Sequence, residues 1–165
     1  MPVRRRASER RPDRMHLVFT KGAGKHDRMA VVRAGVPQAA IGCPKQGIIP
    51  HDMVHYAVEV TLHARGFIAR VAAGEEAVFQ MVPEAQSDGV ERLVEVLQAD
   101  GWSGWTGAPQ DLLDLYHVTC EARGCPPLAI GIGDVEAVRG RVLELTARWA
   151  STPVGASLAL PFPDA

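Results

Sequence analysis

The residues best suited to chemistry lie in one short segment of the chain. His51 and His55 are four residues apart, and Glu59 follows after four more. On an α-helix, where successive residues are about 100° apart, this spacing places the three side chains on one face. Two imidazoles and a carboxylate can bind one divalent cation, and these donors suit zinc. The segment therefore predicts a metal site with His51, His55 and Glu59 as ligands, and Asp52 or His63 would lie beside them.

The opposite face of the same predicted helix is apolar, which places the polar face away from the core. The apolar residues are Met53, Val54, Ala57, Val58 and Val60. A simpler interpretation also remains open. Asp52 near a helix N-terminus is favourable to the helix dipole without any metal. His55 and Glu59, four residues apart, can pair on a solvated or hydrogen-bonded face.

The pentapeptide from His51 to His55 resembles the H-E-x-x-H motif of zinc metalloproteases. Asp52 stands where that motif has its general-base glutamate. Because aspartate is one methylene shorter, its carboxylate would lie further from a metal-bound water. The third ligand also follows His55 after only four residues, which departs from the motif. The resemblance therefore implies metal binding more than peptide hydrolysis.

A longer segment, Pro50–Glu59 followed by Gly66-Phe67 and Ala72-Ala73-Gly74, resembles a family of uncharacterised bacterial proteins. Members of that family share an H-D-x-x-H-[FY]-x-x-E helix. The similarity is best over residues 48–74. The resemblance implies a bacterial source and an α+β shape, and it implies no particular reaction.

A second group of polar residues could join the first. Asp111, Asp114, His117 and Glu121 share one face of a later predicted helix. If that helix packs across the histidine helix, the two faces could form one site, as facing helices do in metal-binding bundles. A solvent-exposed face explains the same pattern without a site.

Other motifs point to turns and loops. Gly22-Ala-Gly-Lys25 and Gly131-Ile-Gly133 each lack residues that a nucleotide-binding loop requires. Trp102 and Trp105 lie in a glycine-flanked loop, and we expect their rings to fold over the edge of the core.

Strand-forming and helix-forming segments are segregated along the chain. Residues 15–20 and 28–33, with turn residues between them, predict a hairpin, and residues 36–41 predict a third strand. Helices are predicted over 50–64, 67–73, 87–99, 109–123 and 134–150, the last with Asp134 as its N-cap. Residues 157–160 predict a final strand that returns to the hairpin. This order favours an α+β fold: a small antiparallel sheet, made of the N-terminal hairpin and the C-terminal strand, packed by four or five helices.

The charge of the chain is divided between two unlike parts. The 165 residues carry a net charge of −1, but residues 1–14 contain six arginines against two acids. We expect residues 1–14 to be a disordered basic leader and residues 15–165 to form a single domain of net charge −5. An acidic domain makes nucleic-acid binding an unfavourable interpretation.

The length of the apolar runs and the number of cysteines bear on membrane association and on the cellular compartment. No apolar run approaches the roughly 20 residues that span a bilayer. Cys43, Cys120 and Cys125 are too few and too irregular for a disulfide framework. The sequence therefore favours a cytoplasmic protein that binds a divalent metal, with hydrolysis as a further hypothesis. The alternative is a non-catalytic interaction or regulatory module whose histidine helix packs against a partner or a second copy as a homodimer.

Overall fold

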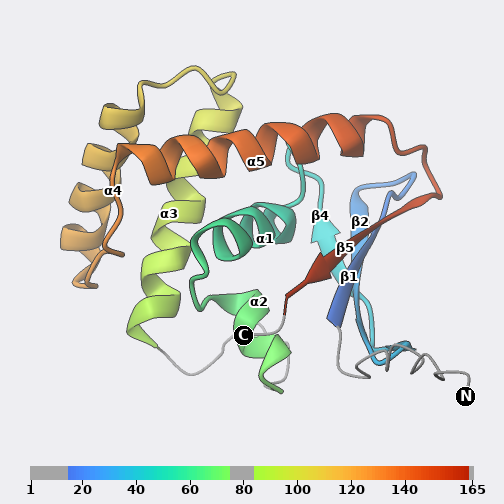
Figure 1. The fold of residues 1–165 in the computed structure, drawn as a ribbon. Coiled ribbons are helices and arrows are strands. Elements are labelled where there is room, and N and C mark those ends of the chain that lie inside the picture. Colours follow the sequence, from blue (N-terminus) through green and yellow to red (C-terminus); the bar gives the residue numbers. More distant parts are fainter. Residues whose placement is uncertain (1–14, 75–83, 164–165) are drawn as a thin grey trace, which may run out of the picture.

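The computed structural model describes residues 15–74 and 84–163, which form an α+β fold (Figure 1). Five strands make one small open antiparallel sheet: β1 (Met15–Thr20), β2 (His26–Arg33), β3 (Val36–Pro37), β4 (Ile41–Pro44) and β5 (Ser157–Phe162). The helices of the described ranges are α1 (His51–Leu62), α2 (Phe67–Ala72), α3 (Ala85–Trp102), α4 (Pro109–Arg123) and α5 (Ile132–Ala150). The predicted fold class is confirmed. The predicted leader, residues 1–14, lies outside the described residues.

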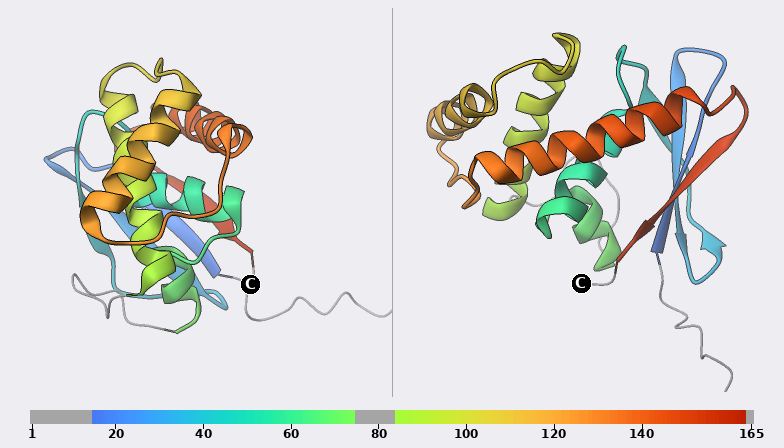
Figure 2. Two further views of the ribbon diagram at one scale, coloured as in Figure 1. Left: turned by 90° about the vertical axis from the view of Figure 1, so that its left-hand side faces the viewer. Right: turned by 45° about the horizontal axis from the view of Figure 1, so that its top comes forward.

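The sheet is built around β1, which pairs antiparallel with β2 on one side and with β5 on the other. Leu17 lies opposite Val31 of β2 and opposite Leu160 of β5. Along β1, Met15, Leu17 and Phe19 are buried and alternate with half-buried residues. Because side chains alternate between the two faces of a strand, one face of the sheet contributes to the core. The helices pack on that side of the sheet (Figure 2).

The third strand differs from the prediction over residues 36–41. The chain instead makes two short pairings with β2, one through β3 and one through β4. Pairing through β4 continues to Pro44, beyond Ile41, where the predicted strand ends. Each short strand ends at a proline, Pro37 or Pro44, which has no backbone N–H for a further ladder bond.

The helices follow the predicted segments closely, and α4 has the predicted bounds. The N-terminus of α5 is different. The helix begins at Ile132, and Asp134 lies within its first turn instead of preceding it. From there, the Asp134 carboxylate accepts a hydrogen bond of 2.9 Å from the backbone N–H of Gly131. Asp134 therefore stabilises the N-terminus of the helix from inside it.

α1 lies at the centre of the helical layer, in contact with α2, α3 and α5 (Figure 1). On the sheet side, the Tyr56 hydroxyl donates a hydrogen bond of 2.7 Å to the carbonyl of Pro161 in β5. Because α1 is covered by the sheet on one side and by other helices on the others, all residues from Met53 to Glu59 are buried. The apolar face is buried as predicted, with Val60 half-buried, but the expectation of a polar face away from the core is wrong for His55 and Glu59. Both are only 2% exposed, because the structure packs α2 and α3 against that face.

None of the helices in the described ranges combines the length and the apolar character needed to cross a bilayer.

Candidate metal centre

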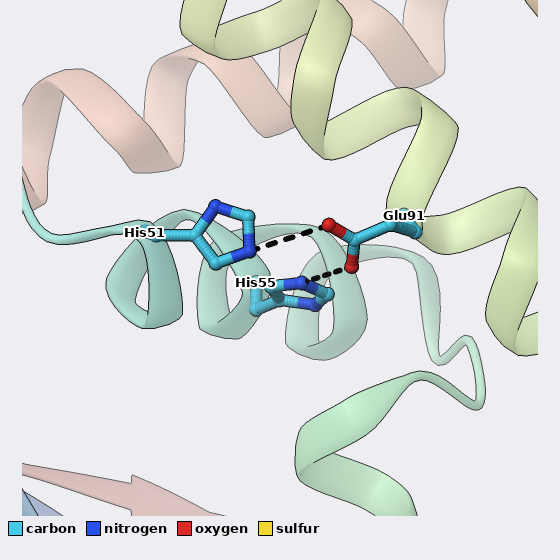
Figure 3. Close-up of side chains that lie close together, drawn as sticks. All are labelled: His51, His55 and Glu91. Atoms are coloured by element: carbon cyan, nitrogen blue, oxygen red, sulfur yellow. Dashed lines mark ion pairs between the residues drawn. The ribbon is translucent and has the colours of Figure 1, made fainter. Parts of the chain in front are cut away.

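Two helices that pack side by side bring three potential metal ligands together (Figure 3). His51 and His55 come from α1, and Glu91 comes from α3. The Nε2 atom of His51 lies 3.3 Å from Oε1 of Glu91, and the Nε2 atom of His55 lies 2.6 Å from Oε2. One ligand atom from each residue lies within 4.8 Å of the others. The carboxylate of Glu91 thus faces both imidazoles at once.

The helical spacing explains this convergence. His51 and His55 lie on successive turns, and their rings contact edge to face with centroids 4.8 Å apart. On α3, Val90 and Val94 are buried in a stripe along the helix, and α3 packs against α1. Glu91 precedes Val94 by three residues, about 60° around the helix, and therefore lies at the edge of this buried stripe. Local helix geometry orients each residue, and the packing of α1 against α3 makes the group.

The three residues differ in their access to solvent. The side chain of His55 is 2% exposed, whereas those of His51 and Glu91 are 39% and 33% exposed. One end of the group is in the core and the other is at the surface. An ion could therefore reach the group from solvent without local unfolding.

The second ring nitrogen of each histidine faces a different acceptor. Nδ1 of His51 lies 3.0 Å from Oε1 of Gln98, a buried residue of α3. Nδ1 of His55 lies 3.4 Å from Oε2 of Glu59. This contact is not a hydrogen bond in the structure, so Nδ1 of His55 has no hydrogen-bond partner among the described residues. Each Nε2 atom is left facing Glu91.

Glu59, the predicted third ligand, is not part of this group among the described residues. Its Oε1 accepts backbone hydrogen bonds from Gly66 and Ala69, at 2.9 and 2.8 Å, and its Oε2 accepts one from Ile68 at 3.1 Å. These donors belong to the N-terminus of α2. Direct ligation by Glu59 stays a prediction, and the geometry favours Glu91 as the carboxylate of the group.

Electrostatic interactions keep charges on the group in the absence of metal. Burial by itself would lower the pKa of His55, but contacts with Glu59 and Glu91 outweigh it and raise that pKa to about 10. Burial would likewise raise the pKa of Glu91, but its contacts with the two histidines hold that pKa well below its usual range. The pKa of His51 is raised, since its contact with Glu91 outweighs the opposing effect of burial. Without a metal, an imidazolium of His55 and a carboxylate of Glu91 form a partly buried ion pair.

The two residues predicted beside the ligands have other surroundings. Asp52 is half-buried, and its Oδ2 lies 3.6 Å from the thiol of Cys43 on β4, which donates to it. His63 is exposed at the C-terminus of α1, where it adopts a left-handed backbone conformation with φ of 51°. Neither residue belongs to the group in the described part of the chain.

The predicted second group does not join the first. α4 packs against α3 and α5, and its polar residues face solvent. The exposed residues are Asp111, Asp114, His117 and Glu121.

The two tryptophans predicted to fold over the core differ in their surroundings. Trp105 packs against the backbone of Gly101. Trp102 is 58% exposed, and its indole N–H donates a hydrogen bond to the carbonyl of Gln46.

Glu91 is the residue that the sequence analysis missed. It lies in the helix predicted over residues 87–99, and its residue type alone does not distinguish it from the other acids there. One pattern could have indicated it. Glu91 and Gln98 are seven residues apart and share one flank of the apolar stripe, nearer to it than Glu95 is. Polar residues at such a boundary are the ones that a packed neighbouring helix meets.

No protein-family model matches the chain, and comparison with curated proteins and with solved structures gives no match either. The resemblance to a bacterial family therefore stays a prediction, and the function has to be argued from the site.

Proposed function

We propose that this protein binds one divalent metal ion of the zinc type through His51, His55 and Glu91. The observation that carries the proposal is the convergence of three ligand atoms, from two helices, within 4.8 Å of one another. Two imidazole nitrogens and a carboxylate oxygen are common zinc ligands. They also leave a coordination position for water, as in zinc sites that bind a further ligand.

The two short contacts run to different oxygens of Glu91, and one ligand atom from each residue lies within 4.8 Å of the others, so binding one ion requires some distances in the group to close by up to about 1.5 Å. Ligand bonds of about 2.0–2.1 Å around a tetrahedral ion separate the ligand atoms by about 3.3 Å. The distance from Nε2 of His51 to Oε1 of Glu91 is already 3.3 Å. The distance from Nε2 of His55 to Oε2 of Glu91 is 2.6 Å, so it would have to open by about 0.7 Å. A neutral imidazole is needed for ligation, so the metal takes the place of the proton on His55.

The proposal is limited to metal binding. A hydrolytic reaction needs a general base near the metal-bound water. Asp52, which holds that position in the resemblance to metalloproteases, instead accepts a hydrogen bond from Cys43. The position that the resemblance gives to a general base is therefore occupied by a residue engaged elsewhere, and metal binding is the function that the geometry supports best.

Metal analysis of protein prepared without an affinity tag tests the proposal. After incubation with Zn²⁺ and removal of the excess, we expect about one ion per chain by mass spectrometry of the metal. The variants His55→Ala and Glu91→Ala should lose the bound ion. His63→Asn and His117→Ala, which change exposed histidines outside the group, should keep it. A wild-type stoichiometry well below one, unchanged in His55→Ala, would contradict the proposal.

A further inference from the structure

A histidine that binds a metal through one ring nitrogen presents the other as an N–H donor. The acceptor of that N–H fixes the tautomer and the orientation of the ring, and it makes the coordinating nitrogen more basic. In this protein each histidine of the group has an oxygen near its Nδ1 atom. These oxygens belong to Gln98 and Glu59.

Gln98 is placed by the same helix that carries Glu91. The two residues are seven apart on α3, about two turns, and therefore share one side of the helix. The Gln98 side chain is buried, and its Oε1 lies 3.0 Å from Nδ1 of His51. With Nδ1–H donating to this oxygen, the lone pair of His51 is on Nε2, which faces Glu91.

Glu59 is held still by the chain around it. Its side chain is fully buried, and three backbone N–H groups at the start of α2 donate to its two oxygens. Glycine at position 66 allows this close approach, because a Cβ there would lie 2.8 Å from Cδ of Glu59. The carboxylate therefore cannot swing toward the group without giving up these bonds. It can accept one more hydrogen bond, and its Oε2 lies 3.4 Å from Nδ1 of His55, which has no hydrogen-bond partner in the described part of the chain.

We propose that Glu59 and Gln98 are positioning residues of the metal site, which hold His55 and His51 with Nδ1 protonated and Nε2 directed at the ion. This inference rests on the proposed function. It also gives Glu59 a second role beside the anchoring of α2. The N-terminus of α2 and the metal site then share one carboxylate, and Phe67 of α2 lies against the ring of His55 with centroids 6.1 Å apart.

The experiment measures Zn²⁺ affinity by competition with a chromophoric chelator. Glu59→Gln keeps the shape of the side chain but puts an amide where the charged acceptor was. Gln98→Met keeps the length and removes the acceptor. Each should weaken Zn²⁺ binding about 10- to 100-fold, the usual effect of losing such a partner. Gln98→Glu keeps an acceptor oxygen and should bind Zn²⁺ at least as tightly as the wild type.

The matched control is Asp100→Asn, the same acid-to-amide change at another buried carboxylate. Asp100 accepts a hydrogen bond from Gly107 and pairs with Arg139, and it lies outside the metal group. It should change stability without changing Zn²⁺ affinity. Circular dichroism verifies that each variant is folded under the conditions of the binding assay.

Imidazole ¹⁵N NMR of the Zn²⁺-bound protein separates positioning from a merely structural role. Wild type should show both histidines protonated at Nδ1 and metal-bound at Nε2, and Glu59→Gln should change the Nδ1 signal of His55. Coordination through Nδ1, or affinities of Glu59→Gln and Gln98→Met within about threefold of wild type, would overturn the inference alone. If Glu59→Gln abolishes binding as completely as His55→Ala, Glu59 is a ligand and the inference is also wrong. Absence of Zn²⁺ binding by the wild type would overturn the proposed function, and this inference with it.

Discussion

The Nε2 atom of His55 lies 2.6 Å from Oε2 of Glu91, and this contact joins the central helix α1 to α3. The imidazole is buried, whereas the carboxylate is about one-third exposed. A solute that approaches from solvent therefore meets Glu91 before it meets His55. The same two groups can serve as an ion pair in the metal-free protein and as ligands in the metal-bound protein.

Zn²⁺ should stabilise the folded protein. A ligand that binds only the folded state at about 100 times its Kd adds about 2.7 kcal/mol to the free energy of unfolding. For a chain of this size, that corresponds to a rise in Tm of about 5–10 °C. Differential scanning calorimetry in EDTA and in Zn²⁺ measures the shift. His63→Asn should show the full rise and the double variant His51→Ala/His55→Ala none. An equal rise in the double variant would show that Zn²⁺ binds elsewhere.

Removing the charge of Glu91 should destabilise the metal-free protein. In Glu91→Gln, the buried imidazole of His55 loses its charged partner at 2.6 Å. We expect the free energy of unfolding to fall by about 1–3 kcal/mol, because a hydrogen bond to a charged group is replaced by one to a neutral amide oxygen. Urea denaturation in EDTA measures it. Glu95→Gln is the control, because Glu95 pairs with Arg92 nearer the surface of the same helix and should change stability by less than about 1 kcal/mol. Equal effects of the two substitutions would contradict the prediction.

The fold was predictable because its signals are local. The alternation of Met15, Leu17 and Phe19 indicates a strand with one buried face. The apolar stripes and glycine boundaries of the later helices indicate their bounds in the same way. The division of the third strand was not predictable from this pattern. It arises because two short segments, which end at Pro37 and Pro44, pair with different parts of β2.

The site was only partly predictable, because half of it comes from contacts between helices. The spacing of His51 and His55 places their side chains on one face of α1, and the structure confirms that they lie together. The spacing does not reveal which elements pack over that face. Glu59 could be assigned to the same face, but its oxygens bind backbone N–H groups of α2, and those groups exist only once the chain has turned at Gly66. Glu91 reaches the group only through the packing of α3 on α1.

The three cysteines should differ in their reactivity with iodoacetamide. Burial, together with the carboxylate of Asp52, raises the pKa of the Cys43 thiol to about 12, and burial raises that of Cys120 to about 11. A higher pKa leaves less of the reactive thiolate at a given pH. At pH 8, a thiol of pKa 12 is about one ten-thousandth ionised, against about a quarter for an unperturbed thiol.

Cys125, which is half-buried, should therefore be alkylated first in the native protein at pH 8. Raising the pH to 9 should still leave Cys43 essentially unmodified, whereas in urea all three should react at similar rates. Peptide mapping by mass spectrometry measures each site. Alkylation of Cys43 as fast as Cys125 in the native state would show that β4 opens away from α1.

Gly66→Ala should impair both the stability of the fold and the metal site. An added Cβ at this position would lie 2.7 Å from Cγ1 of Val90 and 2.8 Å from Cδ of Glu59, so these neighbours must move. Overpacking of this kind costs about 1–3 kcal/mol. The displaced carboxylate would also move away from Nδ1 of His55, so Zn²⁺ affinity should fall with stability.

The control is Gly140→Ala in the exposed interior of α5, where an added Cβ meets nothing within 4 Å. That substitution should stabilise the protein by about 0.5–1 kcal/mol, because alanine favours the helix over glycine, and should leave Zn²⁺ affinity unchanged. Urea denaturation in EDTA and chelator competition measure the two effects separately. If Gly66→Ala lowered stability but bound Zn²⁺ as tightly as Gly140→Ala, the carboxylate of Glu59 would anchor α2 without positioning His55.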